Sequence, residues 1–533
     1  MVSTARSSAD VVRPAAAMDR MRALAQGALV VMTGFLLSRL LGAVRNIVIA
    51  AHFGAGQDYG AYVAAIALPD LVFQVLVGGA VGSAFIPVFK RYNATGEERE
   101  AWHLTSAVIN IFVLIAVSTS LVLAIFARPI MDIWLPGAQN PEFRDEVASL
   151  TRILLISPAI FAASTFCSSV LNSYNRFAVA AMAPLMYNLA IIVAALTLSG
   201  GLGIYSLALG AVVGAVLHLL IQLPFCLRLG MHWRPVIDVR HSGVREVVRL
   251  FTPRVLGLGV VQLNQVLSAI VLASFLGAVS ISYLNYAWQL IMLPLALAMA
   301  VGTAVFPTLS EESALSNEKG FEQLFLLSLR MILFLTIPAS IGLIALGEPV
   351  IRLVFEHYQF DDTSTVGVAS AMVFYALGLA GHATVEIVDR VFYARHDTRT
   401  PVIAAVLAVG VNLTASLLLM HTGLTYRGLA LAASIAALVE ASVLLFFLTR
   451  RMPGLSIDRL ATPSLRILAA SLVMGVPVAW LAGQLDPVLR PYGTPGQALL
   501  LATCIAAGAG LYGVVSLAFR SDEIPTLWRL VRR

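Results

Sequence analysis

Residues 38–46 read SRLLGAVRN, and they lie inside the first long apolar run of the chain, residues 27–53. The run contains two arginines, Arg39 and Arg45, at positions where a membrane helix would be expected to hold hydrocarbon. A charged side chain at the centre of a bilayer costs about 2.5–3.5 kcal/mol even on a lenient insertion scale. Such residues tend to face a water-filled cavity or a partner, so they mark a functional site by default.

The composition places the whole chain in a membrane. Of its 533 residues, 59% are hydrophobic and 12% are charged, whereas a soluble domain carries about 25% charged residues. The formal net charge of +6 comes from basic residues in short loops, which indicates orientation in the membrane rather than binding to nucleic acid. The three cysteines lie far apart in apolar runs, so their spacing predicts neither a disulfide nor a metal site.

Apolar runs of roughly 20 residues, the length that spans a bilayer, predict about fourteen transmembrane helices. Lysine and arginine crowd the loops on one side of these helices, and both ends of the chain fall on that side. Because basic loops stay in the cytoplasm, both termini are expected to be cytoplasmic. We expect residues 1–26 to form a basic cytoplasmic tail and not a signal peptide.

Two parts of the sequence repeat each other. The stretch GSAFIP at residues 82–87 returns as GTAVFP at residues 302–307, an offset of about 220 residues. An even number of helices in each copy predicts two parallel six-helix lobes around a central cavity. The fold expected is an all-α polytopic membrane protein with two further C-terminal helices. The expected parts are a tail (1–26), an N-terminal lobe (27–228), a cytoplasmic linker (229–249), a C-terminal lobe (250–450), two extra helices (465–519) and a second cytoplasmic tail (520–533).

Arg39, Arg45 and Asn46 form a polar strip on the first helix. Seven residues make nearly two helical turns, so Arg39 and Asn46 share a face, and Arg45 lies about a third of a turn away from Arg39. A guanidinium group stays charged and matches the geometry of phosphate. The strip is therefore a candidate site for a phosphate-bearing head group. The alternative is that Arg45 snorkels to the interface and that Arg39 pairs with an acid.

Further polar residues lie at membrane depth in other predicted helices. Asp70 and Gln74 stand one turn apart, as do Asn285 and Gln289. Together with the strip on the first helix, the three amides are expected to line a hydrophilic cavity and to bind substrate. The alternative for each of them is an interhelical hydrogen bond that holds helices together.

The acids of the later helices suggest two different roles. Glu386 precedes Arg390 by four residues, a spacing that favours a structural ion pair. Glu440 is a lone acid in an apolar run, so Glu440 and Asp70 are candidate residues for coupling transport to a proton or cation.

No sequence motif for reaction chemistry is present. Residues 255–310 contain no acid, and the chain has no P-loop, HExxH motif or nucleophile elbow. We therefore expect a transporter without a cofactor, not an enzyme. Its energy would come from an ion gradient, the membrane potential or the substrate gradient.

With these residues in view, the chain resembles the MurJ/MviN family of lipid II flippases, within the multidrug/oligosaccharidyl-lipid/polysaccharide exporter superfamily. The resemblance rests on several segments spread over most of the chain. They are SRLLGAVRN (38–46), AHFGAG (51–56), LPDLVFQVLVGGAVGSAFIPVF (68–89), VLNSYNRFAVAAMAPLMYN (170–188), FPTLSE (306–311) and DRVFYARHDTRTPV (389–402).

The resemblance implies a V-shaped pair of lobes with a cationic cavity, and a groove for a polyprenyl tail formed by the helices of residues 465–519. It implies that an undecaprenyl-pyrophosphate-linked peptidoglycan precursor moves from the inner to the outer leaflet of the cytoplasmic membrane for cell-wall synthesis. Membrane lipid and other cell-wall synthesis proteins are the implied partners. Arg39 and Arg45 match the two arginines that the family uses on its first helix.

The chain departs from the family pattern at four places. Phe73 and Gln289 stand where the family commonly carries arginine, Gly78-Gly79 replaces Glu-Gly, and Asn46 replaces an acid. These departures keep two alternatives open. One is a flippase for another polyprenyl-linked glycan, and the other is a cation-coupled exporter of small amphiphiles.

Overall fold

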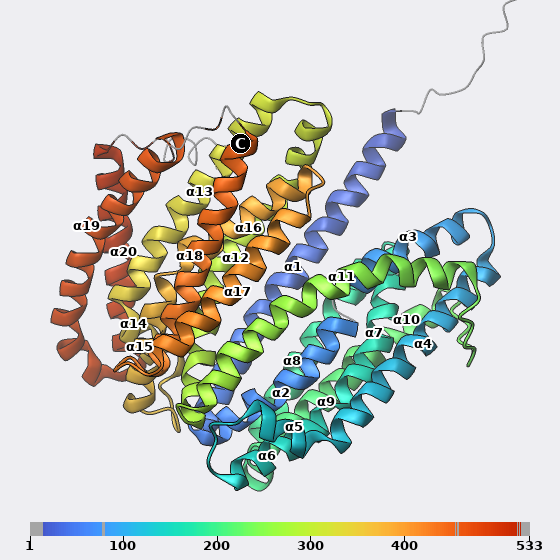
Figure 1. The fold of residues 1–533 in the computed structure, drawn as a ribbon, viewed down its shortest axis with the longest axis horizontal. Coiled ribbons are helices and arrows are strands. Elements are labelled where there is room, and N and C mark those ends of the chain that lie inside the picture. Colours follow the sequence, from blue (N-terminus) through green and yellow to red (C-terminus); the bar gives the residue numbers. More distant parts are fainter. Residues whose placement is uncertain are drawn as a thin grey trace, which may run out of the picture. The chain divides into compact units, whose positions relative to one another are not determined.

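The computed structural model describes residues 14–76, 80–452, 455, 458–519, 521 and 523, and within these residues the chain is built from helices without a strand (Figure 1). Gly78, Gly79, residues 1–13 of the predicted N-terminal tail and most of the predicted C-terminal tail lie outside the described residues, whereas residues 14–26 of the N-terminal tail belong to α1. The helices follow in this order: α1 (Pro14–Phe53), α2 (Gln57–Leu76), α3 (Ala80–Ala94), α4 (Glu98–Ile125), α5 (Ala127–Trp134), α6 (Pro141–Leu154), α7 (Ile156–Ser173), α8 (Phe177–Leu202), α9 (Tyr205–Leu220), α10 (Leu223–Arg228), α11 (Ser242–Val266), a π-helix (Leu267–Leu272), α12 (Ala278–Ala314), α13 (Glu318–Ala345), α14 (Gly347–Phe355), α15 (Asp362–Ala376), α16 (Leu379–Ala394), α17 (Arg399–Leu419), α18 (Tyr426–Arg451), α19 (Asp458–Leu489), a 3-10 turn (Arg490–Tyr492) and α20 (Gly493–Ala518).

The number of membrane-spanning helices differs from the prediction. The described residues contain 11 helices that are long and apolar enough to cross a membrane, or up to 12 if the bent pair α15 and α16 is one span. The count of about fourteen expected from run length is therefore not confirmed. Part of the difference lies at the end of the chain, where residues 461–518 count as one span although they contain both α19 and α20.

Glycine stands at two breaks between helices. α8 ends at Leu202, before Gly203, and α12 begins after Gly277. Gly203 has φ 52° and Gly277 has φ 98°. These left-handed conformations are strained for residues with a Cβ atom, so glycine at these positions allows the chain to leave one helix and enter the next.

The chain folds as two compact units. The first comprises residues 1–48, 72–125 and 152–256, and the second comprises residues 49–71, 126–151 and 257–533. An aromatic core holds α3, α4 and α7 together in the first unit, with fully buried Phe85 in contact with Phe89 and Phe166 at ring distances of 5.4 and 5.5 Å. Such ring pairs stabilise a core beyond the area that they bury.

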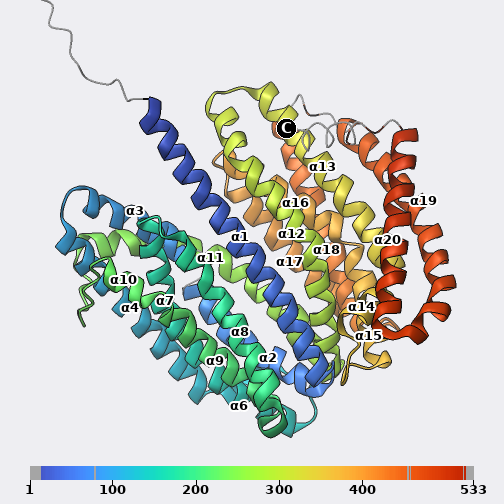
Figure 2. The same cartoon turned by 180° about the vertical axis from the view of Figure 1, so that it is seen from behind.

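The C-terminal helices α19 and α20 pack side by side in the second unit (Figure 2). Tyr512 of α20 is buried and donates a hydrogen bond to the carbonyl of Phe334 on α13 at 3.0 Å. A second attachment is electrostatic. The Arg352 side chain of α14 is 8% exposed and contacts Asp486 of α19 at 3.3 Å.

Candidate functional site

Arg45 of α1 is held by neutral oxygen atoms. Its Nε and Nη2 donate to Oδ1 of Asn46 at 3.2 and 3.0 Å, and its Nη1 donates to Oδ1 of Asn188 at 3.1 Å. No carboxylate pairs with Arg45 among the residues that the structure describes. Amide oxygens orient a guanidinium group without cancelling its charge, so Arg45 retains a full positive charge for an anion.

Asn188 of α8 is the residue that prediction from sequence missed. It is 7% exposed, and its Nδ2 donates to the carbonyl of Pro184 at 3.1 Å. Oδ1 of Asn188 thus faces α1, and a Cβ atom on Gly42 of α1 would lie 4.0 Å from it. A single asparagine in an apolar run, one turn after a proline, was the available signal.

Arg39 lies on the same helix and is exposed. Arg45 and Asn46 are partly buried. The predicted strip on α1 thus combines the exposed guanidinium group of Arg39 with the guanidinium group of Arg45, whose position is fixed by hydrogen bonds. Two such groups within two helical turns suit a ligand with more than one anionic oxygen.

Phe73 and Gln74 of α2 occupy an apolar part of the first unit. The ring of Phe73 lies 5.2 Å from that of Phe161, which also contacts Tyr187 at 5.4 Å and His218 at 5.3 Å. A charged side chain at position 73 would enter this cluster of rings, so phenylalanine is the residue that fits. Gln74 is partly buried and is not joined to Arg45 by a hydrogen bond.

The second unit brings Asn285 and Gln289 of α12 together around Tyr59 of α2. The Tyr59 hydroxyl donates to Oδ1 of Asn285 at 2.9 Å and accepts from Nε2 of Gln289 at 3.2 Å. Gln289 also donates to Oδ1 of Asn285 at 2.5 Å, and its own Oε1 is buried without a hydrogen-bond partner among the described residues. The group is neutral and has one acceptor left for a donor.

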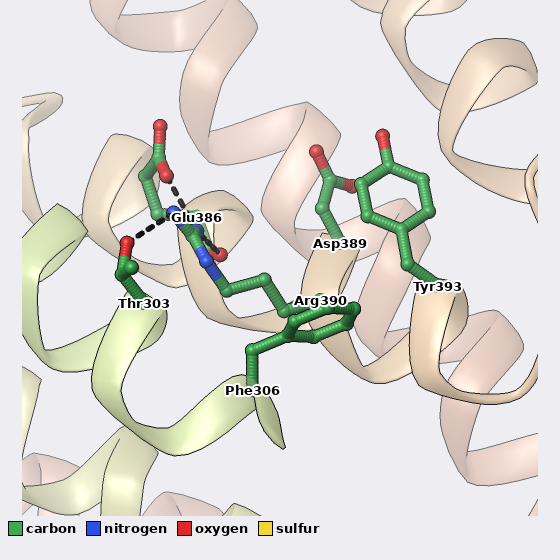
Figure 3. A pocket seen from close by; sticks show the side chains of 6 residues that line it. All are labelled: Thr303, Phe306, Glu386, Asp389, Arg390 and Tyr393. Carbon is green, nitrogen blue, oxygen red and sulfur yellow. Dashed lines mark hydrogen bonds and ion pairs between the residues drawn. The ribbon is translucent and has the colours of Figure 1, made fainter. Parts of the chain in front are cut away.

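A pocket of about 350 Å³ lies between α12 and α16 of the second unit (Figure 3). It is lined by Thr303, Phe306, Glu386, Asp389, Arg390 and Tyr393. The predicted ion pair between Glu386 and Arg390 is confirmed at 2.6 Å, and Arg390 also donates to Thr303 at 3.4 Å. Gly302 makes this arrangement possible, because a Cβ atom there would lie 3.0 Å from the guanidinium group.

Asp389 is a second acid beside this pocket. Its Oδ1 is buried without a hydrogen-bond partner in the described part of the chain. Glu386 and Asp389 line the pocket together with the one guanidinium group of Arg390, and Glu440 of α18 is a third acid near Asp389. Because unpaired charge is costly inside a membrane protein, Asp389 and Glu440 are candidates for taking up a proton.

Asp70, the other candidate for coupling, is exposed on α2. No group of three or more His, Cys, Asp or Glu side chains is placed to hold a metal ion within the described ranges.

Comparison with known proteins supports one family. A family model described as "Lipid II flippase MurJ" matches residues 49–488. The probable lipid II flippase MurJ of Vibrio cholerae is 29% identical over 518 residues, 93% of this chain and 96% of that protein. The protein of the same name from Thermotoga maritima is 30% identical over 501 residues, 93% of this chain and 97% of that protein.

Solved structures give the same result. A structure described as "Lipid II flippase MurJ, inward closed conformation" superposes with a TM-score of 0.78 at 27% identity, and the match covers 93% of this chain and 100% of that chain. An inward-facing multidrug transporter of the MATE family matches with a TM-score of 0.65 at 16% identity, over 78% of this chain and 98% of that one. The second likeness shows a shared fold.

Proposed function

This chain belongs to the MurJ family of lipid II flippases, and from that premise we propose that it moves lipid II from the inner to the outer leaflet by alternating access. It is a transporter of the inner membrane and not an enzyme. The observation that carries the proposal is the guanidinium group of Arg45, which three hydrogen bonds to amide oxygens orient without neutralising. The pyrophosphate of a lipid-linked precursor supplies the matching anion.

We assign roles to five of the six predicted binding residues. Arg39 makes the first contact with the pyrophosphate because it is exposed, and Arg45 and Asn46 hold it once it enters. The amides of Gln74 and Gln289 form hydrogen bonds with the sugar and peptide parts of lipid II, which offer hydroxyl and amide groups. The buried Oε1 of Gln289, which lacks a partner among the described residues, is the acceptor for such a donor.

The remaining features of the proposal concern organisation in the membrane. Both termini and the linker of residues 229–249 lie in the cytoplasm, as the distribution of basic residues favours. Residues 27–228 and 250–450 form the two transporting lobes, and residues 465–519 form the groove for the polyprenyl tail. Other cell-wall synthesis proteins act as partners that supply or consume the lipid.

Transport is coupled to a proton through Asp389 and Glu440, with Asp70 as the other candidate group. The support is the excess of carboxyl groups over guanidinium groups beside the pocket between α12 and α16. Uptake of one proton removes the repulsion between Asp389 and Glu440, and release of that proton restores the repulsion.

The function is tested by replacement of the resident flippase. Cells depleted of their own MurJ should regain outer-leaflet labelling of lipid II when they express this chain. The variant Arg39→Ala should reach the membrane in normal amount and fail to restore labelling, because insertion is easier without the charge. Normal growth on Arg39→Ala as the only flippase would contradict the proposed role of this arginine, and absence of labelling with the unchanged chain would contradict the function.

The coupling is tested in vesicles with an imposed proton gradient. Asp389→Asn and Glu440→Gln should remove the dependence of lipid II flipping on the gradient while leaving lipid II binding intact. Glu386→Gln is the matched control, because Glu386 already forms an ion pair with Arg390. A gradient dependence that survives both substitutions would contradict the assignment.

A further inference from the structure

The segment between α10 and α11, residues 229–241, has no regular secondary structure and lies along the first half of α4 (Figure 2). We call it the α10–α11 linker. Nδ2 of Asn110 on α4 donates to the carbonyls of Arg234 and Val236 at 2.6 and 2.9 Å. Ser106 accepts from the backbone N–H of Arg234 at 3.2 Å. These hydrogen bonds pair backbone groups of the linker with side chains of α4, and they fix the position of the linker along α4.

The exposed surface of the linker is rich in apolar side chains. Trp233, Ile237 and Val239 are 56%, 59% and 60% exposed, and Pro235 between them is also exposed. We call these four exposed apolar residues the ridge. The indole N–H of Trp233 donates to Oδ1 of Asn110 at 2.8 Å, which fixes the ring on the surface.

The ridge continues into the lipid-facing surface of α4. Leu114, Ile115 and Val117 begin an exposed apolar stretch one turn after Asn110. The linker therefore lies at the level where the polar start of α4 gives way to its apolar part. Tryptophan with one polar and one apolar edge is typical of this depth, the interface between head groups and acyl chains.

The acids of this region all have partners within the protein. Asp238 accepts from the backbone N–H groups of Arg240 and His241 at 3.0 Å, and Glu246 pairs with Arg91 at 2.5 Å. Glu100 lies 3.4 Å from the ring of His241.

The arginines of the linker differ from the acids. Arg234 and Arg240 are exposed, and neither of them contacts a carboxylate in the described ranges. The linker thus presents positive charge beside the apolar ridge, where an anion from outside the protein can bind.

We propose that the α10–α11 linker is an interfacial anchor for anionic phospholipid. Trp233, Ile237 and Val239 enter the boundary of the acyl chains, and the guanidinium groups of Arg234 and Arg240 bind lipid phosphates above them. A surface that is both apolar and cationic fits an anionic bilayer and does not fit free phosphate, which offers nothing to the ridge. The anchor holds the start of α4 and the end of α10 at a constant depth in the membrane.

The proposal is tested with the full chain in nanodiscs of phosphatidylcholine with or without phosphatidylglycerol. The difference in fluorescence between the unchanged chain and Trp233→Phe reports on Trp233 alone. We expect this signal to be quenched by lipids brominated on the acyl chain and protected from iodide in water. Quenching by iodide without quenching by brominated lipid would overturn the proposal.

The charges are tested by lipid retention. Native mass spectrometry of the unchanged chain should show a several-fold preference for phosphatidylglycerol, and Arg234→Gln combined with Arg240→Gln should abolish it. Excess inorganic phosphate should leave the preference unchanged. Arg91→Gln is the matched control, because Arg91 is exposed on the same unit but paired with Glu246. An equal loss with Arg91→Gln would show that net charge alone sets the preference, and this result would overturn the site.

Discussion

Replacing Arg352 with methionine is expected to loosen the C-terminal helices from the rest of the second unit. The Arg352 guanidinium group lies 3.2 Å from Glu356 and 3.1 Å from Asp362, and it contacts Asp486 of α19 at 3.3 Å. Asp486 in turn accepts from Gln497 of α20 at 3.0 Å. A single buried side chain therefore joins α14 and α15 to both C-terminal helices.

The size of the effect follows from which acids lose their only cation. Asp362 is 56% exposed and still contacts Arg490 at 2.6 Å in the variant, so losing the contact between Asp362 and Arg352 costs little stability. Glu356 and Asp486 are 21% and 26% exposed and contact no other cation among the described residues. A hydrogen bond to a charged group contributes about 1.5–3 kcal/mol, and two at the lower limit give about 3 kcal/mol. This value agrees with the cost of breaking a buried ion pair, about 3–5 kcal/mol.

The assay is denaturant unfolding of the purified protein, followed by tryptophan fluorescence. A loss of about 3 kcal/mol changes the equilibrium constant about a hundredfold. Arg490→Met is the matched control, because Arg490 is 46% exposed and contacts Asp362 alone. An exposed pair contributes at most about 1 kcal/mol. If both variants unfolded at the same denaturant concentration, Arg352 would not be the central residue of this attachment.

Three further predictions concern other parts of the chain. Asn188→Leu removes the amide that orients Arg45 and should lower outer-leaflet labelling of lipid II about tenfold at unchanged membrane level, because one hydrogen bond to a charged group contributes about 1.5 kcal/mol or more. Burial alone would raise the pKa of Asp397, but hydrogen bonds from Thr400 and Arg451 lower it to about 2 from 3.8. Asp397 therefore stabilises the fold above pH 3.8, and the difference in unfolding midpoint between the unchanged chain and Asp397→Asn should shrink as the pH falls toward 2. Gly378→Ala should lower the free energy of unfolding by about 1–3 kcal/mol, since its Cβ atom would lie 2.5 Å from a backbone atom of α18. Gly410→Ala should raise the free energy of unfolding by about 0.5–1 kcal/mol, because its Cβ atom would meet nothing within 4 Å. Unfolding midpoints of the two variants test both predictions.

The local features of the fold were predictable from the chain. Apolar run length identified the membrane class. Spacing on one helix predicted the ion pair of Glu386 and Arg390. Each of these depends on residues that are close in sequence, where helix geometry determines which side chains meet.

The partners of the functional side chains were not predictable in the same way. Asn188 lies 143 residues from Arg45, and Gln289 lies 230 residues from Tyr59. Phe73 is explained only by its contact with the ring of Phe161 on α7, which in turn packs against rings of α8 and α9.

Composition and periodicity were sufficient to place this protein in a membrane, to locate its helices and to find two arginines at an improbable depth, because the cost of exposing polar groups to lipid acts on every short segment separately. The packing of the helices settled that Arg45 is oriented by amides and keeps its charge, and that Arg352 joins the C-terminal pair to its unit. Such contacts depend on which faces of distant helices meet, and helix packing in a membrane allows many solutions that differ little in local energy.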